Sequence, residues 1–250
     1  MGDGYYPIVF DTLDTVAAFK DNSTSGTGFQ GVALPGGSIV GTNQWSRPGP
    51  GFPYLMNGSI TVDLGAILEL EPGTIVQSGA GGLYVHGKLL LPGTSDLPIV
   101  WSSRNAQPAA GDWTGFYLGP TAGQSVLRHV TIMNAGKDNL GYIHYGYRSA
   151  AFYADMCSPL LDFVTIADSA STGLELYGSS PMLSNMAISR AGWQAIRAET
   201  GSRPTQQKAQ FDEKGKAGTG YSVVAFDASS VATISSIGFN SNRVSGVQIW

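Results

Sequence analysis

The sequence predicts an all-β fold in which short parallel strands wind into a solenoid of about eight stacked coils. The 250 residues include 34 Gly and only 13% charged residues, against typical values of roughly 7% Gly and about 25% charge. A short apolar motif recurs along the chain, and each copy follows a segment in which inward and outward residues alternate. Since 42% of the residues are hydrophobic, the chain has enough apolar surface for a core. The high glycine content and the low charge favour turn-rich β structure.

Charge and cysteine content narrow the partners that the chain is expected to have. The net charge is −4, so few cations are available to neutralise phosphates, and no nucleic-acid partner is expected. No run of about 18 apolar residues occurs, and no membrane span is expected. Cys157 is the only cysteine, which rules out a disulfide within the chain; we expect it to be buried and unreactive.

The spacing of the recurring motif gives the length of one coil. Its copies end at Ile132, Ile166, Ile188, Phe211 and Phe239. The intervals are 34, 22, 23 and 28 residues, which indicates a period of about 22 to 23 residues with two inserted loops. The longer loop holds 12 residues, Lys137–Arg148, and the shorter one adds five near residues 216–220.

A strand with one buried face is predicted before each copy, because its residues read apolar, exposed, apolar. These strands are expected at residues 115–118, 151–154, 173–176, 195–198 and 223–226, with earlier coils at residues 66–76 and 82–101. No such unit can bury its apolar face alone, whereas stacked units can. The glycines fall at the corners between strands, where tight turns need positive φ angles or close backbone approach.

The two ends of the chain carry different signals. Asp11–Lys20 begins with a candidate N-cap and predicts a short capping helix, with an extended strand of a first coil as the alternative. We therefore divide the chain into an N-terminal cap and lead-in segment, residues 1–57, and parallel coils at 58–250. Residues 245–250 match the first strand of another coil, so we expect either further coils in a longer protein or docking of this end on another subunit.

Several segments between residues 33 and 136 carry a family resemblance. They are Leu34–Ile39, Pro53–Leu55, Leu70–Val76, Gly82–Val85, Pro98–Trp101 and Gly111–Gly115. The chain resembles secreted bacterial right-handed parallel β-helix repeat proteins, whose architecture is similar to that of pectate lyases. The resemblance implies a secreted or cell-surface protein that has a structural role, as in an adhesin, or that binds or cleaves polysaccharides. Met1–Gly4 nevertheless lacks the features of a signal peptide. The resemblance assigns no catalytic residue.

If the strands stack in register, their outward side chains form two columns on one sheet. The residues expected to point inward are Leu68, Leu83, Phe116, Phe152, Leu174, Ile196, Val224 and Val247. The first column, one residue further along, is Glu69, Tyr84, Tyr117, Tyr153, Glu175, Arg197, Ala225 and Gln248. The second column, two residues beyond the first, is Glu71, His86, Gly119, Asp155, Tyr177, Glu199 and Asp227. Because the chain is poor in charge, this gathering of aromatic and charged side chains is the main candidate site.

One use of this site is sugar binding. The rings of Tyr84, Tyr117, Tyr153 and Tyr177 are expected to offer flat platforms for sugar rings. Glu175 and Arg197 would then reach hydroxyl or acidic groups of the same ligand.

A second use is catalysis. Asp155, Glu175 and Glu199 lie on neighbouring coils and could provide the paired carboxylates of a glycoside hydrolase. A lyase would need a base, for which Arg197 with Asp155 and Glu199 is the nearest set, and calcium held by clustered acids. A purely structural interpretation stays open as well, since Glu175 beside Arg197 could be a simple ion pair on an exposed sheet.

The longer inserted loop adds candidate ligand-binding residues. His144 and Tyr145 share it with Tyr142, Tyr147 and Arg148, and an aromatic insertion on a rigid scaffold is a typical binding loop. A solvated loop is the alternative. His86 and His129 lack spaced partners, so neither a metal site nor a cofactor is expected, apart from the calcium of the lyase hypothesis.

Three functions follow from these observations. The first is an extracellular or cell-surface structural or binding module, with polysaccharide as the expected ligand. The second is a polysaccharide lyase or glycoside hydrolase acting on the Tyr, Glu and Arg side chains of the two columns. The third is a subunit of an end-to-end assembly joined through the C-terminal coil.

Overall fold

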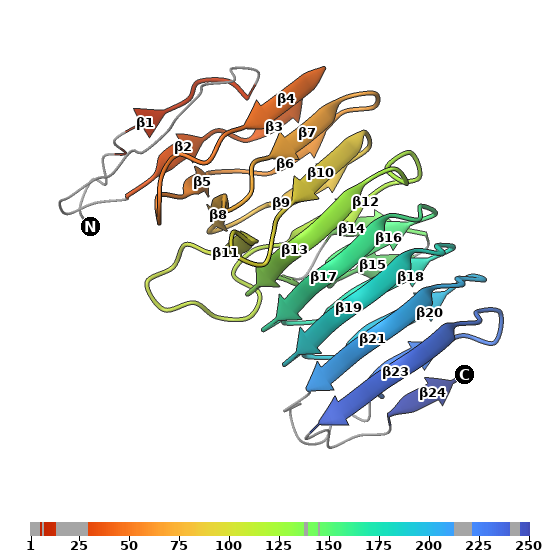
Figure 1. The fold of residues 1–250 in the computed structure, drawn as a ribbon. Helices are drawn as coiled ribbons and strands as arrows, with labels where there is room; N and C mark the ends of the chain where they lie inside the picture. Colours follow the sequence, from red (N-terminus) through yellow and green to blue (C-terminus); the bar gives the residue numbers. More distant parts are fainter. Residues whose placement is uncertain are drawn as a thin grey trace.

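The computed structural model is a stack of β-strands that winds along one axis (Figure 1). It describes residues 6, 8–13, 30–137, 140–144, 146–212, 222–240 and 246–250. All the regular secondary-structure elements assigned within these ranges are β-strands. The strands pair in parallel except for one antiparallel hairpin. The chain is therefore an all-β parallel solenoid, as its repeat predicts.

One side of the solenoid is a nine-stranded parallel sheet, called sheet B here. Its strands are β3 (Gly37–Ile39), β6 (Ile60–Val62), β9 (Gly82–Val85), β12 (Gly115–Leu118), β16 (Ala150–Asp155), β18 (Thr172–Tyr177), β20 (Ile196–Glu199), β22 (Val224–Phe226) and β24 (Val247–Ile249). The strands follow one another across the sheet in chain order. Each one therefore belongs to a successive coil.

The rest of each coil crosses a second, thirteen-stranded parallel sheet, called sheet A. Its strands are β1 (Ile8–Val9), β2 (Val32–Leu34), β4 (Thr42–Trp45), β5 (Tyr54–Met56), β7 (Ile67–Leu70), β8 (Ile75–Ser78), β10 (Lys88–Pro92), β11 (Ile99–Ser103), β13 (Val126–Met133), β17 (Leu160–Ala167), β19 (Met182–Ser189), β21 (Thr205–Asp212) and β23 (Thr233–Asn240). Strands of sheets A and B alternate along the chain from β12 onward, the hairpin aside. This alternation is the coil that the spacing of the motif predicts.

Sheet A is bent along its length. In the early coils it is made of two separate strands per coil, whereas β13 pairs with β10 through residues 126–128 and with β11 through residues 130–132. His129, between these two stretches, has a φ angle of +45°, in the left-handed region. A single residue in this conformation changes the direction of the strand. The eight-residue strand β13 therefore runs in one direction before His129 and in another after it.

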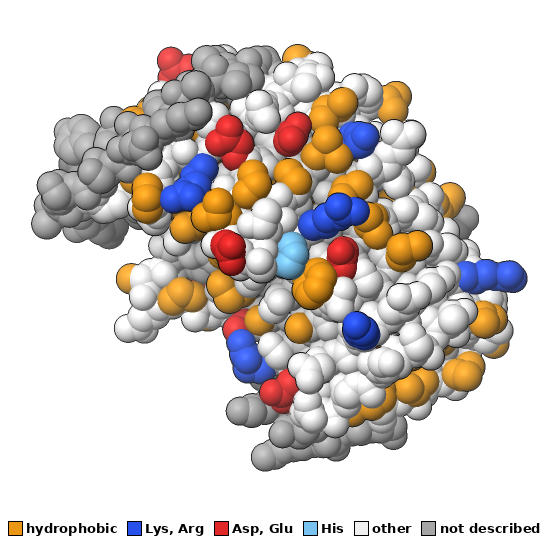
Figure 2. Space-filling model, viewed as in Figure 1, with side chains coloured by type: hydrophobic (Ala, Val, Ile, Leu, Met, Phe, Trp, Pro, Cys, Tyr) orange, Lys and Arg blue, Asp and Glu red, His pale blue; other side chains and the backbone are white. Residues whose placement is uncertain are grey.

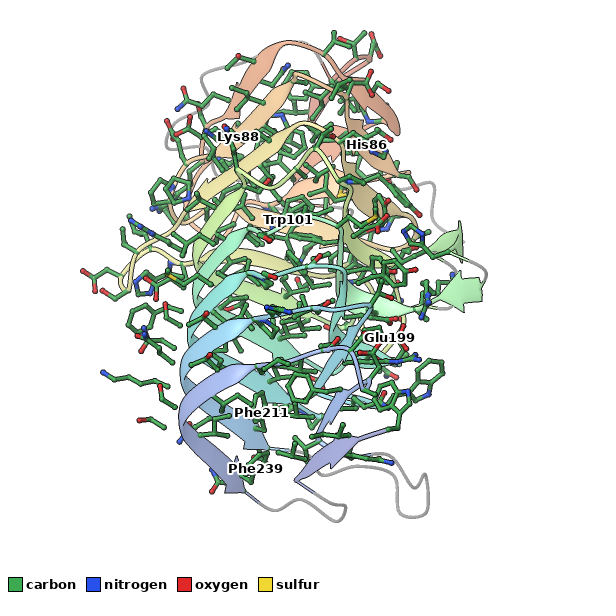
Figure 3. All side chains as sticks on the ribbon, turned by 90° about the vertical axis from the view of Figure 1, so that its right-hand side faces the viewer. His86, Lys88, Trp101, Glu199, Phe211 and Phe239 are labelled. Carbon is green, nitrogen blue, oxygen red and sulfur yellow. The ribbon has the colours of Figure 1, made fainter. Side chains whose placement is uncertain are left out.

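The core lies between the two sheets and is built from ladders of equivalent residues. Leu83, Phe116, Phe152 and Leu174 pair in succession on sheet B and are fully buried. Figure 3 shows Phe211 of sheet A pointing between the sheets. Ile196 and Val224 continue the sheet B ladder and are also buried, so the inward register that alternation predicts is confirmed for β9 to β22. Val247 of β24 keeps the predicted pairing but is 49% exposed.

The predicted register is wrong for one coil. Leu68 was expected to align with Leu83, but Leu68 pairs with Leu89 in sheet A, and Ile60 is the residue that pairs with Leu83. Buried and exposed residues alternate in the same way in strands of both sheets. This coil holds three strands, so alternation alone does not tell which of them joins sheet B. Glu69 consequently lies outside the first column.

The corners of the coils are compact. A Cβ atom at Gly87 would overlap the carbonyl oxygens of Asp63 and Ala66, so only glycine fits there. At a later corner, the Ser202 Oγ accepts a hydrogen bond of 3.0 Å from the Ser179 N–H and donates one of 2.6 Å to the Glu199 carbonyl. Both serines are fully buried, so their hydroxyls satisfy backbone groups that the turn would otherwise leave unpaired.

The predicted capping helix is not supported by the structure. Asp11–Leu13, its first three residues, are irregular, and residues 14–20 lie outside the described ranges. Leu13 is nevertheless buried against the core. In the part of the chain that the structure describes, no helix is long and apolar enough to cross a membrane.

Candidate functional site

The two outer columns of sheet B form largely as the sequence predicts. Tyr84, Tyr117, Tyr153, Glu175, Arg197, Ala225 and Gln248 pair in that order across the sheet. In the second column, Asp155, Tyr177 and Glu199 do the same. The parallel ladder therefore aligns in one column side chains up to 164 residues apart in the sequence.

The inserted loop covers the middle of these columns. It forms an antiparallel hairpin of β14 (Gly141–Ile143) and β15 (Gly146–Arg148), whose base is closed by the Leu140 N–H donating to the Arg148 carbonyl. Leu140, Ala150 and Tyr153 form a small apolar cluster apart from the main core. Tyr153 is 0% exposed and Glu175 is 1% exposed. The expected open platform at these two residues is therefore closed, because the hairpin folds back onto the sheet.

Arg148 anchors the hairpin to two carboxylates. Its Nη1 atom lies 3.0 Å from Glu175 Oε1 and 3.0 Å from Glu199 Oε2. Arg197 pairs closely with Glu199 Oε1, and its Nη1 lies 3.9 Å from Glu175 Oε1. The candidate catalytic residues Glu175, Arg197 and Glu199 are thus brought together, but in a four-membered ionic network with Arg148.

Burial changes the acidity of Glu175. Desolvation raises the pKa of its carboxyl to about 7, although the guanidinium groups of Arg197 and Arg148 oppose the rise. A carboxyl group that titrates near neutral pH is suited to general acid catalysis. Since its side chain is only 2% exposed, however, a substrate could touch it only if the hairpin moved.

Asp155 is held in a separate network. His144, in the turn of the hairpin, places Nε2 at 2.6 Å from Asp155 Oδ1, and the Tyr117 hydroxyl donates a 2.7 Å hydrogen bond to Asp155 Oδ2. Burial and the neighbouring carboxylate raise the pKa of Tyr117 above its usual value. The His144 ring stacks on Tyr177 with the centroids 4.1 Å apart. The Arg148 guanidinium lies 5.6 Å from the centroid of the same Tyr177 ring, so His144 and Tyr177 link the two networks.

Aromatic rings remain partly accessible on both sides of the hairpin. On the N-terminal side, the Tyr117 ring lies 6.1 Å from Tyr84 and 5.8 Å from His86. On the C-terminal side, the Arg197 guanidinium lies 5.6 Å from the ring centroid of Trp250. The continuous column expected from the sequence is therefore divided into two smaller surfaces.

An open groove of about 520 Å³ adjoins the N-terminal surface at the corner between sheets B and A. His86, Lys88 and Thr121 contribute polar groups to it, and Gly65, Gly87 and Gly123 are among its other lining residues. Figure 3 shows His86 and Lys88 on the two sides of this corner. A volume of this size is in the range of pockets that hold small ligands or a few sugar units.

The remaining candidates are placed as follows. Tyr145 lies outside the described residues. Cys157 is buried, and desolvation raises the pKa of its thiol to about 12, so its predicted inertness is supported. Among the described residues, no three His, Cys, Asp or Glu side chains are grouped closely enough to hold a metal ion.

Two contributions to this face were missed by the sequence reasoning. Arg148 was grouped with the aromatic residues of the loop. It lies two residues before β16, and this closeness to a sheet B strand was the sign that its side chain could reach that sheet. Trp250 was not considered, although it follows β24, which the strand pattern identifies.

Comparisons of the chain with protein-family models, with curated proteins and with solved structures gave no match. Its function is therefore inferred from its own geometry.

Proposed function

We propose that the protein is a polysaccharide-binding module of a secreted or cell-surface protein. The coils are proposed to wind right-handed, as in the pectate-lyase-like proteins that the sequence resembles. Strand-to-strand crossovers in a parallel sheet are right-handed in about 98% of cases, which supports this hand.

The observation that carries the proposal is the groove beside the Tyr84, His86 and Tyr117 rings. Half-buried aromatic rings bind the apolar faces of sugars, and Lys88 and Thr121 are placed to meet hydroxyl groups. Tyr117 is fixed by its hydrogen bond to Asp155, so little conformational freedom would be lost on binding.

A glycan-binding screen with three proteins tests this proposal. The parent is expected to bind a defined set of polysaccharides, and Tyr84→Ala with Lys88→Ala to lower the affinity at least about tenfold. Arg190→Ala, on an exposed ion pair remote from the groove, is the matched control and is expected to bind like the parent. If the double variant binds as tightly as the parent, the groove is not the site.

A polysaccharide lyase or glycoside hydrolase is the alternative, and the raised pKa of Glu175 beside Glu199 favours it. The burial of Glu175 and the engagement of both carboxylates by Arg148 argue for a structural network instead. Turnover of any bound polysaccharide by the parent, abolished in Glu175→Gln and Glu199→Gln, would establish the enzyme. Binding without turnover would eliminate it.

An end-to-end assembly is the third proposal. Phe239, Val247 and Ile249 of the C-terminal coil expose apolar side chains, and no described strand pairs with the outer edges of β23 and β24. Such edges can pair with another chain. Sedimentation that shows a monomer at all concentrations would exclude this function.

A further inference from the structure

A column of bend residues runs along the outside of sheet A. Its members are His129 (φ +45°), Phe163 (+52°), Asn185 (+52°), Lys208 (+53°) and Ser236 (+57°). Their neighbours pair in register, so the five residues occupy equivalent places in successive coils. The bend requires a left-handed residue in each coil, but it does not dictate which side chain stands there.

Phe163 is a poor choice for the bend on structural grounds. Asn and Gly adopt the left-handed conformation at the lowest cost, whereas a bulky aromatic residue adopts it rarely. Phe163 is also 46% exposed, so its ring contributes little to the core. Strain and exposure coincide on one side chain, a combination that is found at functional sites.

The ring of Phe163 is held in place and opens onto a groove. The His129 ring stacks on it with the centroids 4.5 Å apart and the planes 8° apart. An open groove of about 490 Å³ begins at Phe163 and continues past Asn185 and Lys208 to Ser236. It crosses β17, β19, β21 and β23, and therefore follows the axis of the solenoid rather than the direction of a strand.

The charge of this groove comes from Lys208. No carboxylate among the described residues lies within ion-pair distance of its ammonium group. Asp162 is engaged instead by the Ser184 hydroxyl at 2.6 Å and the Asn185 amide at 3.0 Å, with Arg128 opposite it in the register. Figure 2 shows that charged side chains are sparse and scattered on this side of the molecule.

We propose that this groove is a second binding site, and that its ligand is a linear glycan bearing anionic groups. Phe163 would contact the apolar face of one sugar ring, and Lys208 would pair with an anionic group further along the chain. The two residues are two coils apart, which is about 10 Å and corresponds to a separation of about two sugar units. The Asn185 amide lines the stretch between them, and the Gln210 amide lines the groove on the same strand as Lys208. Both amides can bond to hydroxyl groups.

The three histidines of the chain report separately on its surfaces. His86 lines the groove of the proposed function, His129 stacks on Phe163, and His144 lies in the hairpin. Side-chain NMR spectra would be recorded with a hyaluronan hexasaccharide, a heparin hexasaccharide and the neutral chitin hexasaccharide. We expect an acidic probe to shift the His129 ring signals and the neutral probe to leave them unchanged.

Variants test the two anchors by calorimetry with the same probes. Phe163→Asn is expected to lower affinity at least about tenfold while keeping or raising stability, because Asn favours the bend conformation. Lys208→Ala is expected to lower affinity similarly, whereas Lys208→Arg keeps it within about threefold. Met182→Ala, an exposed apolar residue of β19 outside the groove, is the matched control and is expected to bind like the parent.

The outcomes separate this site from the first groove. A shift of His129 without His86 supports the second site alone. A shift of His86 without His129, the absence of any shift, equal binding of the neutral probe, or parent-like affinity of Phe163→Asn and Lys208→Ala would overturn it.

Discussion

Arg148 Nη1 lies 3.0 Å from Glu175 Oε1, so an inserted hairpin neutralises a carboxylate that it also buries. The same nitrogen lies 3.0 Å from Glu199 Oε2. The hairpin is thereby attached to two neighbouring coils at once. This attachment makes the middle of sheet B a closed face and leaves ligand access at its two sides.

Replacing Arg148 should destabilise the fold. In Arg148→Met, Glu175 retains only Arg197 at 3.9 Å, and we expect a loss of about 3 kcal/mol in the free energy of unfolding at pH 8. Denaturant unfolding measures it. The control is Arg190→Met, which removes a pair whose side chains are 48% and 33% exposed and should lose less than about 1 kcal/mol. Equal losses of unfolding free energy in the two variants would show that the buried network stabilises the fold no more than an exposed ion pair does.

The stability should depend on the ionisation of Glu175. Its pKa is about 7 in the folded protein and 4.5 ordinarily, so between these values the folded state binds more protons than the unfolded state. The contribution is therefore complete below pH 4.5 and is lost as the pH rises through 7, by at most about 3 kcal/mol. Glu175→Gln should remove this slope from the unfolding free energy measured between pH 4.5 and 8. Parallel curves for parent and variant would contradict the prediction.

Loss of the hydroxyl group should change stability in opposite directions at two tyrosines of the first column, Tyr153 and Tyr117. Tyr153 Oη is buried without a hydrogen-bond partner among the described residues, so Tyr153→Phe should raise stability by up to about 1 kcal/mol. Tyr117→Phe loses the 2.7 Å bond to Asp155 and should lower stability by about 2 kcal/mol. Thermal unfolding of both variants makes the comparison, and the prediction fails if they change in the same direction.

Replacing the buried corner serine Ser202 should lower stability more than replacing the exposed serine Ser180. Ser202→Ala leaves the Ser179 N–H without its acceptor and should cost about 1 to 3 kcal/mol. Ser180 Oγ also accepts from a backbone N–H, that of Arg203 at 3.2 Å, but at an exposed position where water can replace it. Ser180→Ala should therefore change stability by less than about 0.5 kcal/mol, and a comparable loss in both would refute this difference.

The sequence predicts the sheet B register well where one strand alternates clearly in each coil. Phe116, Phe152 and Leu174 are large, regularly spaced and flanked by turns, so burying one residue of each strand fixes the others. The same logic misplaced Leu68, because alternation identifies a strand without saying which sheet it joins. It also could not foresee the bend at Phe163, since the left-handed conformation of that residue depends on the neighbouring coils.

The candidate site was predicted as a set of residues rather than as a surface. Tyr117, Tyr153 and Glu175 do stand side by side, but exposure depends on what covers them. The position of β14 and β15 over the sheet is decided by the contacts of His144 and Arg148, and no local pattern encodes those partners. The position of Lys208 beside the groove, with no carboxylate partner among the described residues, likewise depends on how the coils stack.

The sequence by itself determined the all-β class, the coil length and the first column from Tyr84 onward, because periodic alternation and glycine corners are local properties of the chain. Tertiary structure alone decided that the hairpin closes the centre of sheet B, that Glu175 is buried in an ionic network, and that Phe163 heads a groove across four strands. Burial and charge pairing depend on residues brought together from distant coils, and only the assembled stack specifies them.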